Sequence, residues 1–165
     1  MDHPARLSVK QLLTDCRSVR TRRSGPGGQH RNKVETAVVF EHLPTGIKGE
    51  ASERRSQLQN RQVAIQRLRI QLALQVRRAP SGEPSAAWQQ RVKNGRIAVS
   101  VEHSSFPALL AEALDMVDAH NYDLAAAAKL LSVTSSQLVK LLKKDRAALD
   151  LVNRERQSRD LATLR

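Results

Sequence analysis

The sequence contains very few aromatic residues and almost no cysteine. Aromatic side chains make up 2% of its 165 residues, and Cys16 is the single cysteine. So few rings disfavour recognition of single-stranded nucleic acid by base stacking, which needs aromatic platforms. One cysteine excludes an internal disulfide and is typical of a reducing compartment. The first residues, MDHPARLSVKQ, lack an apolar signal region, and no apolar run approaches the roughly 18 residues of a membrane span, so we expect a cytoplasmic protein without membrane contact.

Acidic residues are outnumbered by basic ones. The chain has 28 Lys and Arg against 16 Asp and Glu, a formal net charge of +12, with a pI near 11.0. This excess indicates a polyanionic partner, either nucleic acid or an acidic membrane surface. Residues 1–78 hold 16 basic and 6 acidic residues, net +10, whereas residues 79–165 hold 12 and 10, net +2. We therefore expect the first part to meet the partner, through phosphate contacts of Arg and Lys.

Local patterns at the start of the chain predict one helix and three extended segments. Residues 7–13 have the spacing of a short amphipathic helix, and residues 16–24 form a basic extended segment. Residues 38–51 predict a β-hairpin, because Pro44 presets φ in its turn and Gly46 accepts a positive φ.

A long helix is predicted to follow the hairpin, from Ser56 to Arg78. Apolar residues recur at spacings of three and four along one of its faces, at Ile65, Leu68, Leu72 and Val76. Together with the preceding hairpin, this helix predicts a small α+β domain.

The middle of the chain has the composition of a linker. Residues 79–86, APSGEPSA, contain two prolines and a glycine. Ile97, Val99 and Val101 then alternate with other residues, which predicts one short strand.

From Ser105 onward the sequence predicts an all-α domain. Pro107 lies near the start of a first helix, and Asp123 and Asp145 are candidate N-caps of later ones. The last helix is expected over residues 145–164, with leucines 151, 161 and 164 packed.

Within this domain, residues 123–144 resemble a helix-turn-helix. Ser132 stands near the place of the usual turn glycine, and six residues have the expected buried spacing: Ala126, Ala127, Leu130, Val133, Leu138 and Leu141. A functional helix-turn-helix would present Ser135, Ser136, Gln137, Lys140, Lys143 and Lys144 to nucleic acid. A plain helical bundle explains the same pattern, since this geometry is also a common way to pack helices.

The stretch SGPGGQHRNK, residues 24–33, combines three glycines with a glutamine and no obvious nucleophile. It lacks the spaced glycines after a buried strand that a dinucleotide loop needs, and it lacks the GK[ST] ending of a phosphate loop. Taken alone, Pro26, Gly27 and Gly28 are equally well explained by a flexible surface turn. Its neighbours in the sequence favour a functional loop.

Three motifs occur in order along the chain: RSGPGGQH at 23–30 followed by Asn32 and Lys33, HLPTGI at 42–47, and RSQLQNR at 55–61. In order and spacing they resemble the peptidyl-tRNA hydrolase domain of the class I peptide chain release factors and of their short relatives that rescue stalled ribosomes. The tripeptide GGQ alone would be weak support. The resemblance covers roughly residues 15–78.

The resemblance implies a catalytic role for Gly27, Gly28 and Gln29. The glycines have no Cβ, so the backbone approaches RNA closely and adopts φ values closed to other residues. The Gln29 backbone N–H would stabilise charge on the departing ribose oxygen, and its side-chain amide would position water and exclude larger nucleophiles. In the family this glutamine is a methylation target, so Gln29 is a candidate for N5-methylation by a Gln methyltransferase.

Basic and polar residues beside these motifs are implied to contact ribosomal RNA. Each alone is better explained as a solvated surface group, and only their clustering around the loop favours the RNA contact. Arg31 departs from the family, in which an apolar or small residue is common. The predicted RNA-binding residues are Arg20, Arg22, Arg23, Ser24, His30, Arg31, Asn32, Lys33, Arg55, Ser56, Gln57, Asn60 and Arg61.

We accordingly predict a catalytic domain at 1–78, a linker with one short strand at 79–104 and a helical, helix-turn-helix-like domain at 105–165. The expected activity is hydrolysis of peptidyl-tRNA in the ribosomal peptidyl-transferase centre. Nothing in the sequence resembles the motifs that read a stop codon, so we expect a codon-independent rescue factor. Its expected partners are large-subunit RNA and P-site peptidyl-tRNA, and we expect a monomer. The five histidines lack ligand spacing, so no metal or other cofactor is predicted.

Two alternatives stay open at the level of sequence. One is hydrolysis of free or large-subunit-bound peptidyl-tRNA. The other is a non-catalytic protein that docks on RNA, or a regulator that binds DNA through the helix-turn-helix. The intact Gly-Gly-Gln favours an enzyme, because a degenerate binder would have no reason to keep it.

Overall fold

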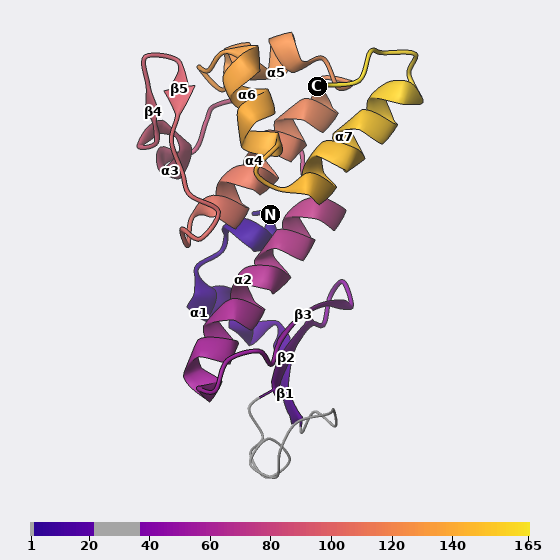
Figure 1. Ribbon diagram of the computed structural model, residues 1–165. Helices are drawn as coiled ribbons and strands as arrows, with labels where there is room; N and C mark the ends of the chain where they lie inside the picture. The colour runs from indigo at the N-terminus through magenta and orange to yellow at the C-terminus, as the bar shows by residue number, and fades with distance from the viewer. Residues whose placement is uncertain (1, 22–36) are drawn as a thin grey trace. The chain divides into compact units, whose positions relative to one another are not determined.

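The computed structural model describes residues 2–21 and 37–165 and shows an α+β protein (Figure 1). The chain divides into two compact units. Unit 1 comprises Met1–Arg6 and Ala73–Arg165, and unit 2 comprises Leu7–Leu72. Within the described residues, no helix is both long and apolar enough to cross a membrane.

Unit 2 is built on an antiparallel sheet in the order β1-β2-β3, formed by β1 (Cys16–Thr21), β2 (Ala37–His42) and β3 (Ile47–Ala51). Helix α1 (Val9–Thr14) precedes it. The predicted hairpin between β2 and β3 is confirmed. Gly46 has φ +70°, and the N–H groups of Thr45 and Gly46 donate to the His42 carbonyl at 3.2 and 2.8 Å.

Helix α2 (Gln57–Gln75) packs its first part against one face of this sheet. The register pairs Val38 with Ala51 and Phe40 with Gly49, and all four residues are buried. At Gly49 the contact is between backbones: a Cβ built there would lie 2.4 Å from both the Ala64 carbonyl oxygen and the Leu68 nitrogen. Glycine is therefore what lets the helix lie this close to the strand.

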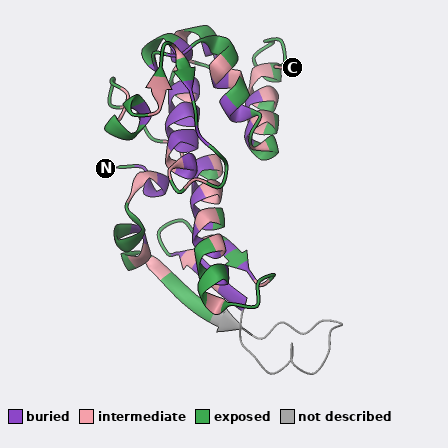
Figure 2. Cartoon of the chain, turned by 60° about the vertical axis from the view of Figure 1, so that its left-hand side comes forward, coloured by how far each residue is buried: buried purple, intermediate pink, exposed green. Residues whose placement is uncertain are grey.

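Unit 1 is organised around α4 (Phe106–Ala119), of which eleven residues are buried, on all sides (Figure 2). The short 3-10 helix η1 (Pro4–Arg6) packs against it. Around it lie α5 (Leu124–Leu130), α6 (Ser135–Leu142) and α7 (Arg146–Gln157). The early residues of the chain thus complete the core of the later ones.

The predicted caps are confirmed at α5 and α7. Asp123 accepts hydrogen bonds from Ala125 and Ala126, and Asp145 accepts one from Ala148. The turn between α5 and α6 places Ser132 at φ +55°, the conformation that glycine usually supplies. Two of the six predicted core residues are not buried. Ala126 is half-buried, and Leu130 is 41% exposed while Leu131 is buried, because α5 ends in a turn that directs Leu131 inward.

Residues 79–104, expected to be a linker with one strand, contain α3 (Ala86–Gln89) and a hairpin of β4 (Val92–Lys93) and β5 (Arg96–Ile97). Only Ile97 of the three alternating residues lies in a strand. The fully buried Trp88 anchors this segment, and its indole N–H donates to the Leu131 carbonyl at 2.8 Å.

The last helix is shorter than predicted. It ends at Gln157, where Asp160 takes φ +57° and the Leu161 N–H returns to the Arg156 carbonyl at 2.9 Å. The chain then folds back, and the Asn153 amide binds both backbone groups of Leu164. Leu161 is 37% exposed because this reversal takes it away from the helix face.

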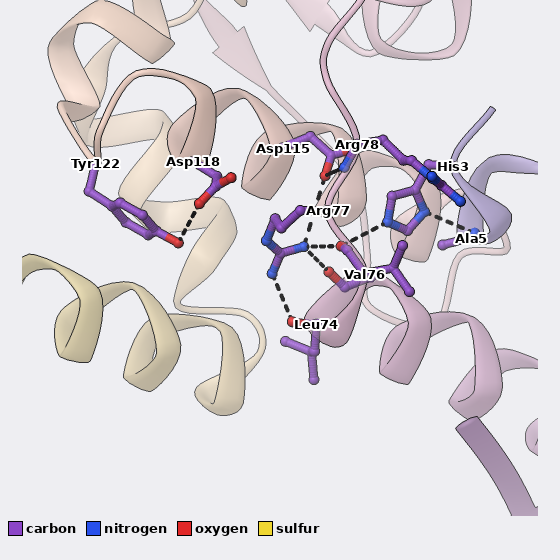
Figure 3. A network of polar contacts seen from close by, with 10 residues as sticks. His3, Ala5, Leu74, Val76, Arg77, Arg78, Asp115, Asp118 and Tyr122 are labelled. Atoms are coloured by element: carbon purple, nitrogen blue, oxygen red, sulfur yellow. Dashed lines mark hydrogen bonds and ion pairs between the residues drawn. The ribbon is translucent and has the colours of Figure 1, made fainter. Parts of the chain in front are cut away.

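A polar network closes unit 1 where η1, the end of α2 and α4 meet (Figure 3). The Ala5 N–H donates to His3 Nδ1 at 3.0 Å, so Nε2 carries the proton and donates to the Val76 carbonyl at 3.1 Å. Arg77 binds the same carbonyl. Asp115 accepts the Arg78 N–H at 3.0 Å and lies 3.9 Å from the Arg77 guanidinium.

Candidate functional site

The stretch that carries Gly27, Gly28 and Gln29 joins two strands that pair directly with each other. Thr21, the last residue of β1, is the register partner of Ala37, the first residue of β2. Partners in an antiparallel ladder have Cα atoms about 4.5–5.5 Å apart. Both ends of the 22–36 segment are therefore fixed on adjacent strands of one sheet.

The same end of the sheet also carries the start of α2. Val38 pairs with Arg20 on one side and with Ala51, the last residue of β3, on the other. The chain leaves β3 there and reaches Arg55 four residues later. Two motifs separated in the sequence, GGQ and RSQ, thus connect to one end of a single sheet.

Asn60 fixes the backbone between β3 and α2. Its side chain is fully buried, its Oδ1 accepts the Arg54 N–H at 2.9 Å, and its Nδ2 donates to the Arg54 carbonyl at 2.9 Å. Asn60 was predicted to contact RNA. Burial and these two hydrogen bonds give it a positioning role instead, which is a correction to that prediction.

Ser56 begins α2 in the manner of an N-cap. Its carbonyl accepts the Asn60 N–H at 3.0 Å, and its hydroxyl accepts the Gln59 N–H at 3.4 Å. The side chain is exposed, as is that of Arg55, and Gln57 is half-buried. The R-S-Q motif therefore combines a helix start with an accessible cation.

Three arginines at this helix start are exposed: Arg54, Arg55 and Arg61. None of the three forms an ion pair with an acidic side chain in the parts of the chain that the structure describes. The Arg61 guanidinium lies over the Phe40 ring, 5.7 Å from its centroid, and the residue stays exposed to solvent. These cations are available to phosphates.

The acidic residue that directly precedes Arg54 in the sequence, Glu53, is already engaged. Its carboxylate accepts from Arg67 at 2.6 Å and from the Ser52 N–H at 2.9 Å. Hydrogen bonds from the backbone N–H groups of Glu53 and Ser52, with the Arg67 guanidinium, hold the pKa of this carboxyl below its ordinary value. Arg67 also donates to the Glu50 carbonyl at 2.8 Å. Arg67 therefore neutralises Glu53 and leaves the neighbouring arginines unopposed.

The far end of the sheet is different in character. The HLPTGI motif forms the β2–β3 turn there, where His42 Nδ1 lies 2.8 Å from the Thr45 hydroxyl. Burial lowers the pKa of His42. On the outer face, Glu41 binds Arg17 at 2.6 Å and Lys48 at 4.0 Å. This motif therefore shapes the hairpin, and its neighbouring charges are paired.

Most of the predicted site falls outside the described residues. Arg20 lies on β1, opposite Val38. Arg55, Ser56, Gln57, Asn60 and Arg61 lie at the start of α2. The predicted residues outside the described part of the chain are Arg22, Arg23, Ser24, Gly27, Gly28, Gln29, His30, Arg31, Asn32 and Lys33. Their catalytic and RNA-binding roles stay predictions.

Two supporting residues escaped the sequence reasoning. Arg67 was visible only as one of many arginines, and its pairing with Glu53 depends on how α2 packs. Gly49 had a readable signal, because a glycine inside a strand often marks a close approach of another backbone.

Comparison with known proteins places this site in a family. The RF-1 domain matches residues 8–105, more than half of the chain. Peptide chain release factor 1 of Acidiphilium cryptum is 42% identical over 86 residues, 52% of this chain and 24% of that protein. The mitochondrial peptide chain release factor 1-like protein of Rattus norvegicus is 50% identical over 71 residues, 42% of this chain and 19% of that protein.

A plastid protein gives a similar result: chloroplastic peptide chain release factor PrfB1 of Arabidopsis thaliana is 39% identical over 82 residues, 45% of this chain and 18% of that protein. This chain spans a quarter or less of the length of these three relatives. The family match continues beyond residue 78 to include α3 and the β4–β5 hairpin. The chain belongs to the RF-1 domain family and carries the GGQ domain of the class I peptide chain release factors.

Proposed function

We propose that this chain hydrolyses the ester bond of peptidyl-tRNA on the ribosome and releases the nascent peptide from stalled complexes without reading a codon. The observation that carries the proposal is the position of Gly27-Gly28-Gln29 in the sequence. The tripeptide lies between two strands paired at Thr21 and Ala37, in a chain of the release-factor family.

The fixed ends of the segment support a probing role for it. Catalysis gains most from a group held in place before the substrate arrives, and the β1–β2 ladder supplies a rigid base. The ladder is held in turn by the contact of Gly49 with α2. A sheet end that displays unpaired arginines is also suited to an RNA surface.

The proposed reaction needs no protein nucleophile. Water attacks the ester carbonyl carbon, the bond from that carbon to the terminal ribose oxygen breaks, and the ribose oxygen takes up a proton. We propose that the Gln29 backbone N–H stabilises the charge developing on that oxygen and that its side-chain amide positions the water. Gly27 and Gly28 give the backbone the narrow cross-section needed inside RNA. The ribosome supplies the surrounding walls and the proton relay.

Contacts to large-subunit RNA would hold the domain in place. We propose that Arg55 and Arg61 bind phosphates from the start of α2, with Ser56 and Gln57 beside them. Arg20, Arg22, Arg23, Ser24, His30, Arg31, Asn32 and Lys33 would do the same around the tripeptide. The exposure and unpaired charge of Arg55 and Arg61 support their part of this assignment.

Codon independence is proposed for the activity of these 165 residues. None of their segments resembles the motifs with which codon-reading relatives inspect a stop codon. The codon in the A site should then have no influence on the rate of release. Methylation of Gln29 is proposed as a modification of the same residue.

The test is peptide release from purified ribosomes that hold peptidyl-tRNA in the P site. Three complexes with a vacant A site are compared: one with a sense codon there, one with a stop codon, and one whose mRNA is truncated before the A site. We expect release in all three cases, with no advantage for the stop codon. Gly28→Ala and Gln29→Ala should each lower the rate by roughly 100-fold or more, because misplaced or missing groups at the reacting bond cost that much.

Gln62→Ala, at an exposed position of α2, is the matched control and should release at the wild-type rate. Release that depends on the stop codon would contradict codon independence. Ribosome binding without release on any complex would show a non-catalytic binder instead.

A further inference from the structure

Unit 1 has a small net charge, but its basic residues are unevenly distributed along the chain. From Pro84 to Val101 the chain has three basic residues and no acidic one, and from Leu124 to Lys144 it has four and none. An acidic residue bounds each segment at both ends: Glu83 and Glu102 flank the first, and the caps Asp123 and Asp145 flank the second. Two basic segments therefore stand out in a region that is nearly neutral overall.

The fold joins these two segments. The Trp88 indole N–H donates to the Leu131 carbonyl at 2.8 Å, and the Thr134 N–H donates to the Gly95 carbonyl at 3.1 Å. These hydrogen bonds tie α3 and the tip of the β4–β5 hairpin to the two sides of the α5–α6 turn. A hairpin and a helix start are thereby held against each other.

The hairpin itself is short and tightly turned. Its two-residue turn is Asn94-Gly95, with φ of 49° and 72°, and β4 and β5 are paired up to Lys93 and Arg96 on either side. An Asn-Gly turn with both residues at positive φ matches the natural twist of a two-stranded ribbon. Lys93 and Arg96 are thus cross-strand neighbours on either side of the turn.

Two adjoining surface depressions follow this junction. One, of about 710 Å³, is lined by residues of the hairpin that include Lys93 and Arg96. The other, of about 640 Å³, is lined by residues from Ile97 to Val101, by Lys140 of α6 and by Lys144, which follows α6. Ala98 lines both. We call the four basic residues and the depressions between them the hairpin–α6 surface.

The charges of this surface are unneutralised. Lys93, Arg96, Lys140 and Lys144 are all exposed, and none forms an ion pair with a described residue. By contrast, two other arginines of unit 1 form ion pairs: Arg146 of α7 pairs with Asp150, and Arg159, just after α7, pairs with Glu155. Among the described residues, no acidic side chain lines either depression, although Glu102 directly follows Val101 in the chain.

The chemistry of the surface selects a type of partner. The four aromatic residues of the chain, Phe40, Trp88, Phe106 and Tyr122, are all buried, so no ring is available for stacking on bases. Recognition of single strands relies on such rings, whereas a double helix is bound through its phosphates. Spaced cations along an open depression fit a duplex backbone.

We propose that the hairpin–α6 surface binds the phosphate backbone of an RNA double helix, as a second RNA contact separate from the GGQ end of unit 2. The choice of RNA over DNA rests on the proposed ribosomal function. The duplex contact itself rests on the charge segregation and the two hydrogen bonds that assemble the surface. Non-specific contact with phosphates predicts affinity that depends strongly on salt and weakly on sequence.

The test measures binding of the full chain to a short fluorescent RNA duplex by anisotropy at several salt concentrations. The variant Arg96→Gln/Lys140→Gln/Lys144→Gln removes three charges from the surface. The control Arg146→Gln/Arg154→Gln/Arg165→Gln removes three exposed charges elsewhere in unit 1. We expect the surface variant to weaken binding about tenfold or more and to lower the salt slope by about 3, one for each lost phosphate contact. The control should change affinity less than about threefold.

Equal weakening by both variants would overturn the proposal, since it would show only general electrostatics. Equal or tighter binding of a DNA duplex of the same sequence, with the same loss in the surface variant, would overturn the choice of RNA. Gln29→Ala should bind the duplex like the wild type. Because this assay contains no ester, it succeeds or fails independently of peptide release. Circular dichroism of each variant checks that it is folded.

Discussion

The two units of this protein carry positive charge in different ways. Unit 2 has 13 basic and 5 acidic residues, net +8, and much of this excess lies in its sequence motifs. Unit 1 has 15 basic and 11 acidic residues, net +4, and its unpaired cations gather only when the β4–β5 hairpin folds against α6. The basic surface of unit 2 can therefore be predicted from sequence motifs, whereas that of unit 1 can be identified only from the folded structure.

The cores differ as well. Unit 2 depends on one close approach between backbones, at Gly49, where α2 meets β3. Unit 1 surrounds α4 with side chains and satisfies its buried polar groups through hydrogen bonds, as at Asp115 and Glu112. The first core should be sensitive to added volume, and the second to changes in charge.

The largest effect is expected from Gly49→Ala. The new methyl group would lie 2.4 Å from backbone atoms of Ala64 and Leu68, which do not move as a side chain would. We expect the free energy of unfolding of unit 2 to fall by about 3 kcal/mol. Chemical denaturation followed by circular dichroism measures this loss, and peptide release should fall with it.

The single tryptophan makes this experiment a direct comparison of the units. Trp88 is fully buried in unit 1, so its fluorescence reports on that unit while circular dichroism reports on both. The Trp88 transition of Gly49→Ala should stay near that of the wild type. If it moves as far as the circular dichroism transition, the units unfold as one. Ser18→Ala, at an exposed position of the same sheet, should change neither.

The next largest effect concerns pH and unit 1. Burial, with the charges of Arg77, Arg6 and Arg78, lowers the pKa of His3 to about 4, although the hydrogen bond to Val76 opposes the shift. Burial raises the pKa of Asp115 to about 6, and the negative charge of Asp118 adds to this rise. The hydrogen bond from the Arg78 N–H and the charges of Arg77 and Arg6 oppose it. His3 therefore destabilises folded unit 1 as pH falls from 6.5 to 4. Asp115 has the opposite effect: its protonation stabilises folded unit 1 as pH falls from 6 to 3.8.

These two slopes nearly cancel, so Trp88-detected stability of the wild type should be almost flat between pH 4 and 6. His3→Gln should make stability rise as pH falls through this range, and Asp115→Asn should make it fall. Each change should amount to about 2–3 kcal/mol, from linkage of roughly 1.4 kcal/mol per pH unit. Parallel pH profiles for all three proteins would contradict this balance.

The sequence reasoning succeeded where a signal and its effect lie close together in the chain. Pro44 and Gly46 made the hairpin turn, and Asp123 and Asp145 capped the helices that follow them. It gave no role to Trp88, whose hydrogen-bond partner Leu131 lies 43 residues away.

The candidate site follows the same rule. Asn60 was read as an RNA contact because its motif surrounds it, but its burial depends on how the chain enters α2. The strand partners Thr21 and Ala37 are 16 positions apart, and periodicity alone does not fix their register. The residue types of the candidate site could be predicted from the sequence, but their positions in space could be assigned only from the fold.

A tenfold effect is expected from the basic helix start of unit 2. Arg55→Gln combined with Arg61→Gln should lower kcat/KM for peptide release about tenfold and reduce its salt slope by about 2, because two phosphate contacts are lost. Rates of release at several salt concentrations measure both quantities. Lys10→Gln with Lys48→Gln removes the same charge from other exposed positions of unit 2 and should have a small effect. Equal losses in both double variants would show that only net charge matters.

The smallest effect comes from one turn of unit 1 in which a serine, not a glycine, takes a positive φ. Unit 2 places Gly46 at φ +70°, whereas unit 1 places Ser132 at φ +55° in the turn next to the hairpin–α6 surface. A left-handed residue with a Cβ costs about 1–2 kcal/mol, and glycine regains most of this while giving unfolded chains more freedom. Ser132→Gly should therefore raise the stability of unit 1 by about 0.5 kcal/mol in Trp88-detected denaturation. Ser136→Gly, four residues on and inside α6, should lower it by a similar amount, because glycine is the poorer helix former. Opposite signs from the same substitution would identify backbone conformation, rather than loss of the hydroxyl, as the cause.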